Sequence, residues 1–236
     1  MKHRVLFAGI DGSGKTTCLN LLIPRMESKY SITKIGNCDP CTYYRGESKS
    51  FFRRRYYSVI ERIRPISIKY HFHSLFLIFN FIYKLLVSKY AELSTQSDLI
   101  MYETDTLLHP AVYINYHLPF IGVIHAKLKF SLLSLIFGSK NNSSIFYLDT
   151  APEVAMERIH RRASHINAHE NTRDLAKLKK DFEIVQEVAL REGYAIYRID
   201  TNNRSLEEVA REVERIVETK MANRPEAWRA VTANEI

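Results

Sequence analysis

Hydrophobic positions along the chain alternate between two patterns. Short apolar runs predict strands, and between them apolar residues recur at helical spacing. The expected strands are 4–8, 32–36, 99–103, 145–149 and 194–200, and the expected helices are 16–27, 152–162, 174–192 and 205–220. Strands that alternate with helices are typical of a parallel sheet. We therefore expect an α/β fold in which a five-stranded parallel sheet is flanked by helices.

The last of these helices has the clearest amphipathic pattern. Its apolar side chains fall on one face, at Leu206, Val209, Val213, Ile216 and Val217. Ser205 followed by Glu208 is the sequence pattern of a capping box. This helix is expected to form an outer layer on the sheet.

Composition narrows the class of protein. The 236 residues are 46% hydrophobic and 25% charged, which excludes disorder and a collagen-like repeat. There are 34 Lys and Arg against 26 Asp and Glu, a net charge of +8. The binding partner is therefore expected to be anionic: a phosphate, nucleic acid or an anionic membrane surface. No nucleic-acid-binding module is recognisable, so nucleic acid is not expected.

Cysteine use and hydropathy point to a cytoplasmic protein. Three cysteines are too few for a disulfide scaffold, and an odd number suits a reducing compartment. The apolar stretch near the N-terminus is interrupted by Gly9, far short of a signal-peptide core. The longest uncharged apolar run, 74–83, is too short to span a membrane even when extended past Lys84.

The strongest chemical signal is a glycine-rich loop directly after the first strand. Residues 9–16 read G-I-D-G-S-G-K-T and match the pattern G-x-x-x-x-G-K-S/T, immediately before an amphipathic helix. In such a loop the backbone N–H groups and the helix N-terminus bind phosphates. Lys15 would reach the β- and γ-phosphates, and the Thr16 hydroxyl would bind Mg²⁺. ATP or GTP binding follows.

A phosphoryl-transfer site also needs a carboxylate at the end of a neighbouring strand to organise the metal. Glu103 follows four apolar residues and is the first candidate, with Asp105 as the second. The alternative is that either carboxylate only caps the next turn.

The residues resemble those of thymidylate kinases. Residues 9–17 (GIDGSGKTT) are similar to the family's phosphate loop, and 146–155 (FYLDTAPEVA) to its Y-L-D-x-x-P-E-x-A segment. A third stretch, from Phe182 through 193–200 to 206–209, resembles the C-terminal helix, strand and adenine-side loop. Together these cover about half the chain. The resemblance implies a P-loop NTPase fold with ATP and Mg²⁺ as cofactors.

The resemblance also implies individual roles. Asp11 would contact the acceptor's sugar hydroxyl, and Asn202 and Asn203 would lie beside the adenine. The expected nucleotide-binding residues are Gly9, Asp11, Gly12, Ser13, Gly14, Lys15, Thr16, Thr17, Asn202 and Asn203.

Arginines on the helix 152–162 form the second half of the expected site. Arg158 and Arg162 match the arginines that begin the family's mobile lid and would stabilise the transferring phosphoryl group. Gly12 and Ser13 stand where one class of the family places an arginine, so the catalytic guanidinium should come from the lid, with Arg161, Arg162 or Arg173 as the local choices. A solvated basic helix face is the alternative.

The acceptor side departs from the family. The family's R-E-P-G-G is replaced by 36–41 (GNCDPC), its D-R is Glu103-Thr104, and its F-x-x-x-D-R has no counterpart in 75–84. Either other cations, such as Arg45 and the cluster 53–55, replace these contacts, or the acceptor is not dTMP. The cluster can equally be an exposed basic helix turn.

The aromatic stretch 72–90 has apolar residues almost all round a helix, which favours a core or a homodimer interface. Peripheral membrane docking or a lipid-linked acceptor is the alternative. Cys38 and Cys41 form a lone C-x-x-C without a second pair for zinc, and His109, His117 and His125 show no catalytic spacing.

These observations predict an enzyme: a cytoplasmic, homodimeric, Mg²⁺- and ATP-dependent kinase (a transferase) whose acceptor is a nucleoside monophosphate such as dTMP. The alternatives are a kinase for a sugar, lipid-linked or other small acceptor, and a non-catalytic nucleotide-binding module. A single domain is expected over 1–221, with a helical acceptor-side segment at 43–137 and a lid at 160–174. A loosely attached tail would follow at 222–236.

Overall fold

A computed structural model describes residues 2–35, 86, 88–117, 134, 140–162 and 171–223. Within these residues five strands form one sheet in the order β2-β3-β1-β4-β5, and every neighbouring pair is parallel. The strands are β1 (His3–Ala8), β2 (Ile32–Ile35), β3 (Leu99–Tyr102), β4 (Ser143–Asp149) and β5 (Ala195–Asp200). The expected α/β fold with a five-stranded parallel sheet is confirmed.

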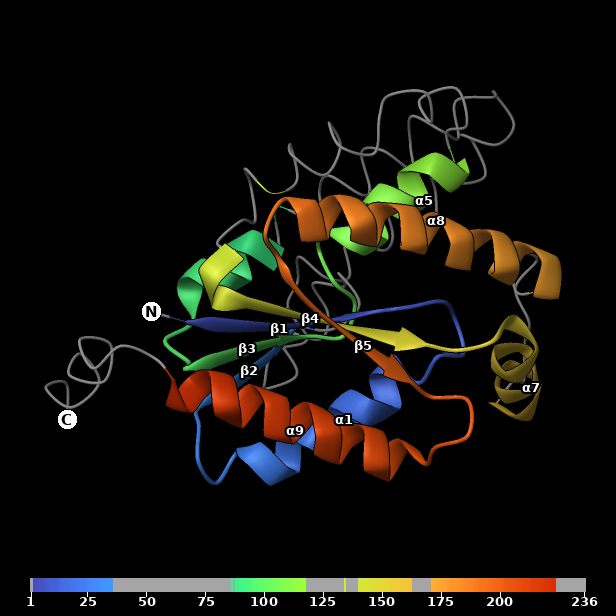
Figure 1. Cartoon of the computed structure of the whole chain (residues 1–236). Helices are drawn as coiled ribbons and strands as arrows, with labels where there is room; N and C mark the ends of the chain where they lie inside the picture. The colour runs from blue at the N-terminus through green and yellow to red at the C-terminus, as the bar shows by residue number, and fades with distance from the viewer. Residues whose placement is uncertain are drawn as a thin grey trace, which may run out of the picture.

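Helices cover both faces of the sheet (Figure 1). Helices α1 (Lys15–Met26) and α9 (Leu206–Ala222) pack together on one face, and α5 (Leu108–His117) and α8 (Thr172–Arg191) on the other. Helix α7 (Pro152–Arg162) lies beyond the carboxyl end of β4. A short 3₁₀ turn, η1 (Lys140–Asn142), precedes β4, and residues 88–94 are helical before β3. The expected helix boundaries are confirmed to within two residues.

The central strand β1 is buried along its whole length, because its side chains alternate between two cores. Leu6 and Ala8 contribute to the core beneath α5 and α8. Val5 and Phe7 contribute to the core on the side of α1 and α9, where the rings of Phe7 and Phe146 lie 5.9 Å apart. A strand covered on both faces is mostly apolar, which explains the apolar run 5–8. Its first two residues, His3 and Arg4, are polar but also buried.

The strand order brings distant residues to one edge of the sheet. Leu6 of β1 pairs with Tyr102 of β3, and Ala8 pairs with Tyr147 of β4. The loop after β1, the residues after β3 and the start of α7 therefore meet at the carboxyl ends of the strands. In open parallel sheets, ligands bind at this edge.

Several predictions fall outside the described residues. They concern Cys38 and Cys41, Arg45, the cluster 53–55, the aromatic residues 72–85, His125, the lid residues 163–170 and the tail 224–236. In the ranges that are described, no helix combines the length and the apolar character needed to cross a membrane.

Candidate phosphate-binding site

The loop between β1 and α1 is closely packed against two other parts of the chain. Gly12 has φ +80°, and a Cβ there would lie 2.4 Å from the carbonyl oxygen of Ala155 in α7. Gly14 has φ +93°, and a Cβ there would lie 2.6 Å from Leu206 Cδ2 at the start of α9. Both positions favour glycine for backbone conformation. At Gly12 the backbone carbonyl of Ala155 also leaves no space for a side chain, whereas the Leu206 methyl group beside Gly14 is the end of a flexible side chain. The first contact also leaves no room for an arginine at position 12.

Lys15 folds back over this loop. Its Nζ donates hydrogen bonds to the carbonyl oxygens of Gly9 and Ile10, each at 2.8 Å, and to Ser13 Oγ at 3.4 Å. Ser13 is fully buried, and its N–H donates to the Ile10 carbonyl at 3.2 Å. The lysine cation is thus held at the centre of the loop, where a phosphate would offer it charged acceptors.

Helix α1 starts differently from α5, α8 and α9. Asp105, Asn171 and Ser205 each accept hydrogen bonds from backbone N–H groups at the starts of α5, α8 and α9. In the part of the chain that the structure describes, α1 begins after Gly14 with no side-chain cap and no acidic residue in its first turn. The N–H groups and the positive end of its dipole are left for an anion.

Thr16 and Glu103 connect the loop helix to the end of β3. The Thr16 hydroxyl donates to Glu103 Oε1 at 2.5 Å. Thr16 is exposed and Glu103 is partly exposed, so both oxygens can be reached from solvent. These are the hard oxygen ligands that Mg²⁺ prefers.

Asp105, the second carboxylate, has another role in the structure. It is fully buried, and its two oxygens accept hydrogen bonds from the backbone N–H groups of Leu107, Leu108 and His109. It therefore caps α5, as the alternative interpretation of the sequence allowed. Burial raises the pKa of Asp105 to about 6, although these three hydrogen bonds and the charge of Lys15 lower it.

Charges of four side chains from three parts of the chain act on Lys15. Burial lowers the pKa of Lys15, while the negative charges of Asp11, Asp105 and Glu103 raise it. The positive charge of Arg162, from the last turn of α7, lowers the pKa of Lys15 further. Arg162 and the three expected carboxylates therefore all influence the charge state of Lys15.

The other arginines point elsewhere. Arg158 donates from Nη2 to the Thr201 carbonyl oxygen at 2.6 Å and from Nη1 to the Thr201 hydroxyl at 3.3 Å. Arg161 pairs with Glu157 at 2.5 Å, and its side chain is 76% exposed. Arg173 is exposed in the first turn of α8. Of these arginines, Arg162 is the one whose charge acts on Lys15.

Three more residues that were expected to bind the nucleotide are Asn202, Asn203 and Thr17. Asn202 Oδ1 accepts a hydrogen bond from the Ala151 N–H at 2.6 Å, and its amide donates to Asp200 at 2.6 Å. Asn203 is exposed after β5, and Thr17 is exposed on α1.

Two threonines that the sequence did not single out, Thr150 and Thr201, lie directly after β4 and β5. The hydroxyls of Thr150 and Thr201 lie 2.6 Å apart, and both side chains are buried. Each follows the last residue of a strand, which is the one sequence signal that could have drawn attention to them.

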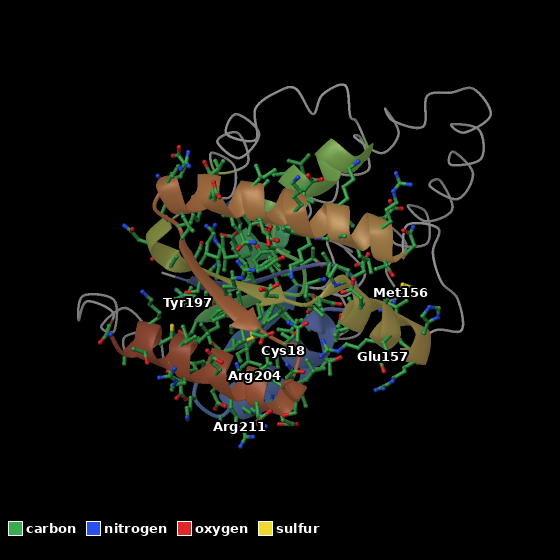
Figure 2. All side chains as sticks on the ribbon, turned by 45° about the vertical axis from the view of Figure 1, so that its right-hand side comes forward. Cys18, Met156, Glu157, Tyr197, Arg204 and Arg211 are labelled. Atoms are coloured by element: carbon green, nitrogen blue, oxygen red, sulfur yellow. The ribbon has the colours of Figure 1, made fainter. Side chains whose placement is uncertain are left out.

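Two further observations concern the third cysteine and the expected metal. Cys18 of α1 belongs to the core on the α1 and α9 side of the sheet (Figure 2), and burial raises the pKa of its thiol to about 12. Over the described ranges, no group of three or more His, Cys, Asp or Glu side chains could hold a metal ion. The Mg²⁺ expected here would rest on Thr16, Glu103 and nucleotide phosphates, as Mg²⁺ commonly does.

A scan against protein-family models and a search of curated proteins find no match to this chain.

Proposed function

We propose that this protein is a Mg²⁺- and ATP-dependent kinase, similar to thymidylate kinases, that transfers the γ-phosphoryl group to a nucleoside monophosphate such as dTMP. One arrangement carries the proposal: a lysine in a glycine loop, an uncapped helix behind it, and a Thr16–Glu103 pair at the end of the adjacent strand. Each part serves phosphoryl transfer, in which catalysis is largely positioning and charge neutralisation.

Each residue of the site has a separate role in the proposed phosphoryl transfer. The loop N–H groups and Lys15 bind the donor phosphates, and Arg162 adds positive charge from α7. Thr16 and Glu103 would hold Mg²⁺, which when bound neutralises phosphate charge. Asp11 orients the acceptor, as the resemblance implies. No arginine stands at positions 12 and 13, so the catalytic guanidinium should come from the lid, and of Arg161, Arg162 and Arg173 we assign it to Arg162, whose charge acts on Lys15.

The experiment that tests the proposal is calorimetry with MgATP followed by transfer assays. Wild-type protein is expected to bind MgATP, and Lys15→Ala to lose turnover with its thermal unfolding intact. Lys29→Ala, an exposed lysine that pairs with Glu218 on α9, is the matched control. Absence of MgATP binding at millimolar concentration in the wild type contradicts the proposal.

A second candidate has the same donor site and a different acceptor. Thr104 is buried where the family has an arginine, so the acceptor phosphate lacks that contact here. A panel of nucleoside monophosphates, sugars and lipid-linked acceptors with labelled ATP separates the two. Efficient transfer to dTMP excludes the second candidate, whereas ATP binding without transfer to any acceptor favours a nucleotide-binding module.

We also propose that the protein is a homodimer. Leu86, Tyr90 and Leu93 are spaced by four and three residues and are 59%, 64% and 68% exposed. Such a stripe suits a contact with a second copy. Light scattering should give twice the chain mass for the wild type and the monomer mass for Tyr90→Glu.

A further inference from the structure

We propose that Thr201 is a positioning residue: by holding the guanidinium of Arg158, it fixes α7 against the phosphate loop. The inference rests on the proposed function, because it assigns α7 a task in the donor site. It also gives Arg158 a role different from direct contact with phosphate.

Thr201, directly after β5, is buried and makes hydrogen bonds to three other residues. Its side chain is fully buried, and its hydroxyl lies 2.6 Å from Thr150 Oγ1. Its N–H donates to the Asp149 carbonyl oxygen at 3.0 Å. Its carbonyl and hydroxyl oxygens both accept hydrogen bonds from Arg158. One residue thus joins the ends of β4 and β5 to the middle of α7.

Helix α7 is attached to residues 201–202 at two points. The Ala151 N–H, just before the helix, donates to Asn202 Oδ1 at 2.6 Å. Arg158 binds Thr201 about two turns further along. Two attachments on one helix fix its direction as well as its distance from the sheet.

The orientation of α7 determines where two of its residues lie relative to the phosphate loop. Ala155 lies between the two attachments, and its carbonyl oxygen occupies the space beside Gly12. Arg162 lies one turn beyond Arg158, and its charge reaches Lys15. A small rotation of α7 would move both groups, and a misplacement of about 1 Å can cost about 100-fold in rate.

A double-mutant cycle in the full-length protein separates this role from direct phosphate contact. Arg158→Met is expected to lower kcat by about 10- to 100-fold and Thr201→Val by about 3- to 10-fold, with KM for MgATP changed less than about threefold in both. Arg158→Met removes both hydrogen bonds to Thr201, whereas Thr201→Val removes only the one to the hydroxyl. The double variant should therefore lose no more than Arg158→Met alone. Thr201→Ser, which keeps the hydroxyl, should restore most of kcat.

The matched control is Thr33→Val. This threonine also makes two side-chain hydrogen bonds, to Thr95 and Ser97, each at 2.6 Å, but at the opposite edge of the sheet. It should keep wild-type kcat. Multiplicative losses in the cycle, or wild-type kcat in Thr201→Val, would overturn the inference.

Hydrogen exchange provides a readout that does not depend on turnover. Backbone amides of α7 should exchange faster in Thr201→Val and in Arg158→Met, while those of α9 keep their protection. Unchanged exchange in α7 refutes the positioning role even if the protein is a kinase. Faster exchange in α7 of the variants, together with no MgATP binding by the wild type, refutes the proposed function but supports the role of Thr201 in holding α7.

Discussion

The hydroxyl of Thr16 and the carboxylate of Glu103 are joined by a 2.5 Å hydrogen bond, although 87 positions separate them in the chain. The bond connects the first turn of α1 to the end of β3. It forms because β1 and β3 are parallel neighbours whose carboxyl ends meet. If these oxygens hold Mg²⁺, altering the carboxylate must change how activity depends on the metal.

We therefore predict that Glu103→Gln weakens the apparent affinity for Mg²⁺ by about 10- to 100-fold, since the amide keeps the shape and loses the charge. Titration of phosphoryl transfer with Mg²⁺ measures the effect. Glu187→Gln, which alters an exposed pair with Arg191 on α8, should leave the titration unchanged. An unaltered Mg²⁺ requirement in Glu103→Gln removes Glu103 from the metal site.

Gly12→Ala and Gly193→Ala form a matched pair. Both glycines have positive φ, but a Cβ at Gly193 meets nothing within 4 Å, whereas at Gly12 it collides with the Ala155 carbonyl oxygen. Gly193→Ala should cost about 1 to 2 kcal/mol of unfolding free energy from backbone strain alone. Gly12→Ala should cost about 1 to 3 kcal/mol more because of overpacking.

Urea denaturation measures both costs, and calorimetry should show loss of MgATP binding in Gly12→Ala only. Equal destabilisation of the two variants would contradict the predicted overpacking, because it would mean that α7 moves away from a Cβ at position 12 at no cost.

A buried ion pair ties the helical residues 88–94 to the sheet. Glu92 lies 3.0 Å from Arg4 of β1 and accepts a hydrogen bond from the Tyr102 hydroxyl at 3.1 Å. Glu92→Leu should destabilise the fold by about 3 to 5 kcal/mol, because it leaves a buried cation without its partner. The double variant Arg4→Met/Glu92→Leu should recover much of that loss in urea denaturation. A double variant as unstable as the single one contradicts this account.

Acidic pH should remove the contribution of Asp149 to the stability of the fold. Burial raises the pKa of Asp149, but hydrogen bonds and charges from Lys179 and Arg198, at 2.7 and 2.6 Å, outweigh burial and lower it. The folded pKa is below the unfolded one, so the stabilisation is present above pH about 4 and is lost as the pH falls through the folded value.

Urea midpoints measured from pH 3 to 7 should therefore decline less steeply on acidification in Asp149→Asn than in the wild type. Lys179→Met should shift the decline to higher pH. An identical acid limb in all three proteins rules out this carboxylate as its source.

Much of the fold could be predicted from periodicity alone. The strands appear in the sequence as short apolar runs, whereas in 174–192 and 205–220 the apolar residues recur at helical spacing. The two patterns are therefore easy to tell apart. The capping box of Ser205 and Glu208 was also predicted and is present. Short-range patterns of this kind depend on neighbours in the chain, which the sequence displays directly.

The site could be predicted only in part, because the rest depends on contacts between distant segments. Glu103 and Asp105 look alike in sequence, yet one side chain reaches Thr16 and the other turns inward to cap α5. Arg158 and Arg162 both lie on α7, but only the surrounding fold determines that Arg158 binds Thr201. The contact of Gly12 with Ala155 leaves no trace in the sequence at all.

The order in which the phosphate loop is assembled follows from its neighbours. The segment 9–14 leaves the ribosome well before the residues that press upon it, which are Leu148 beside Gly9, Ala155 beside Gly12 and Leu206 beside Gly14. If the loop binds ATP as proposed, we expect a nascent chain to gain that affinity only once translation has passed the start of α9. During synthesis, a nascent chain that ends before that point should show no affinity for ATP.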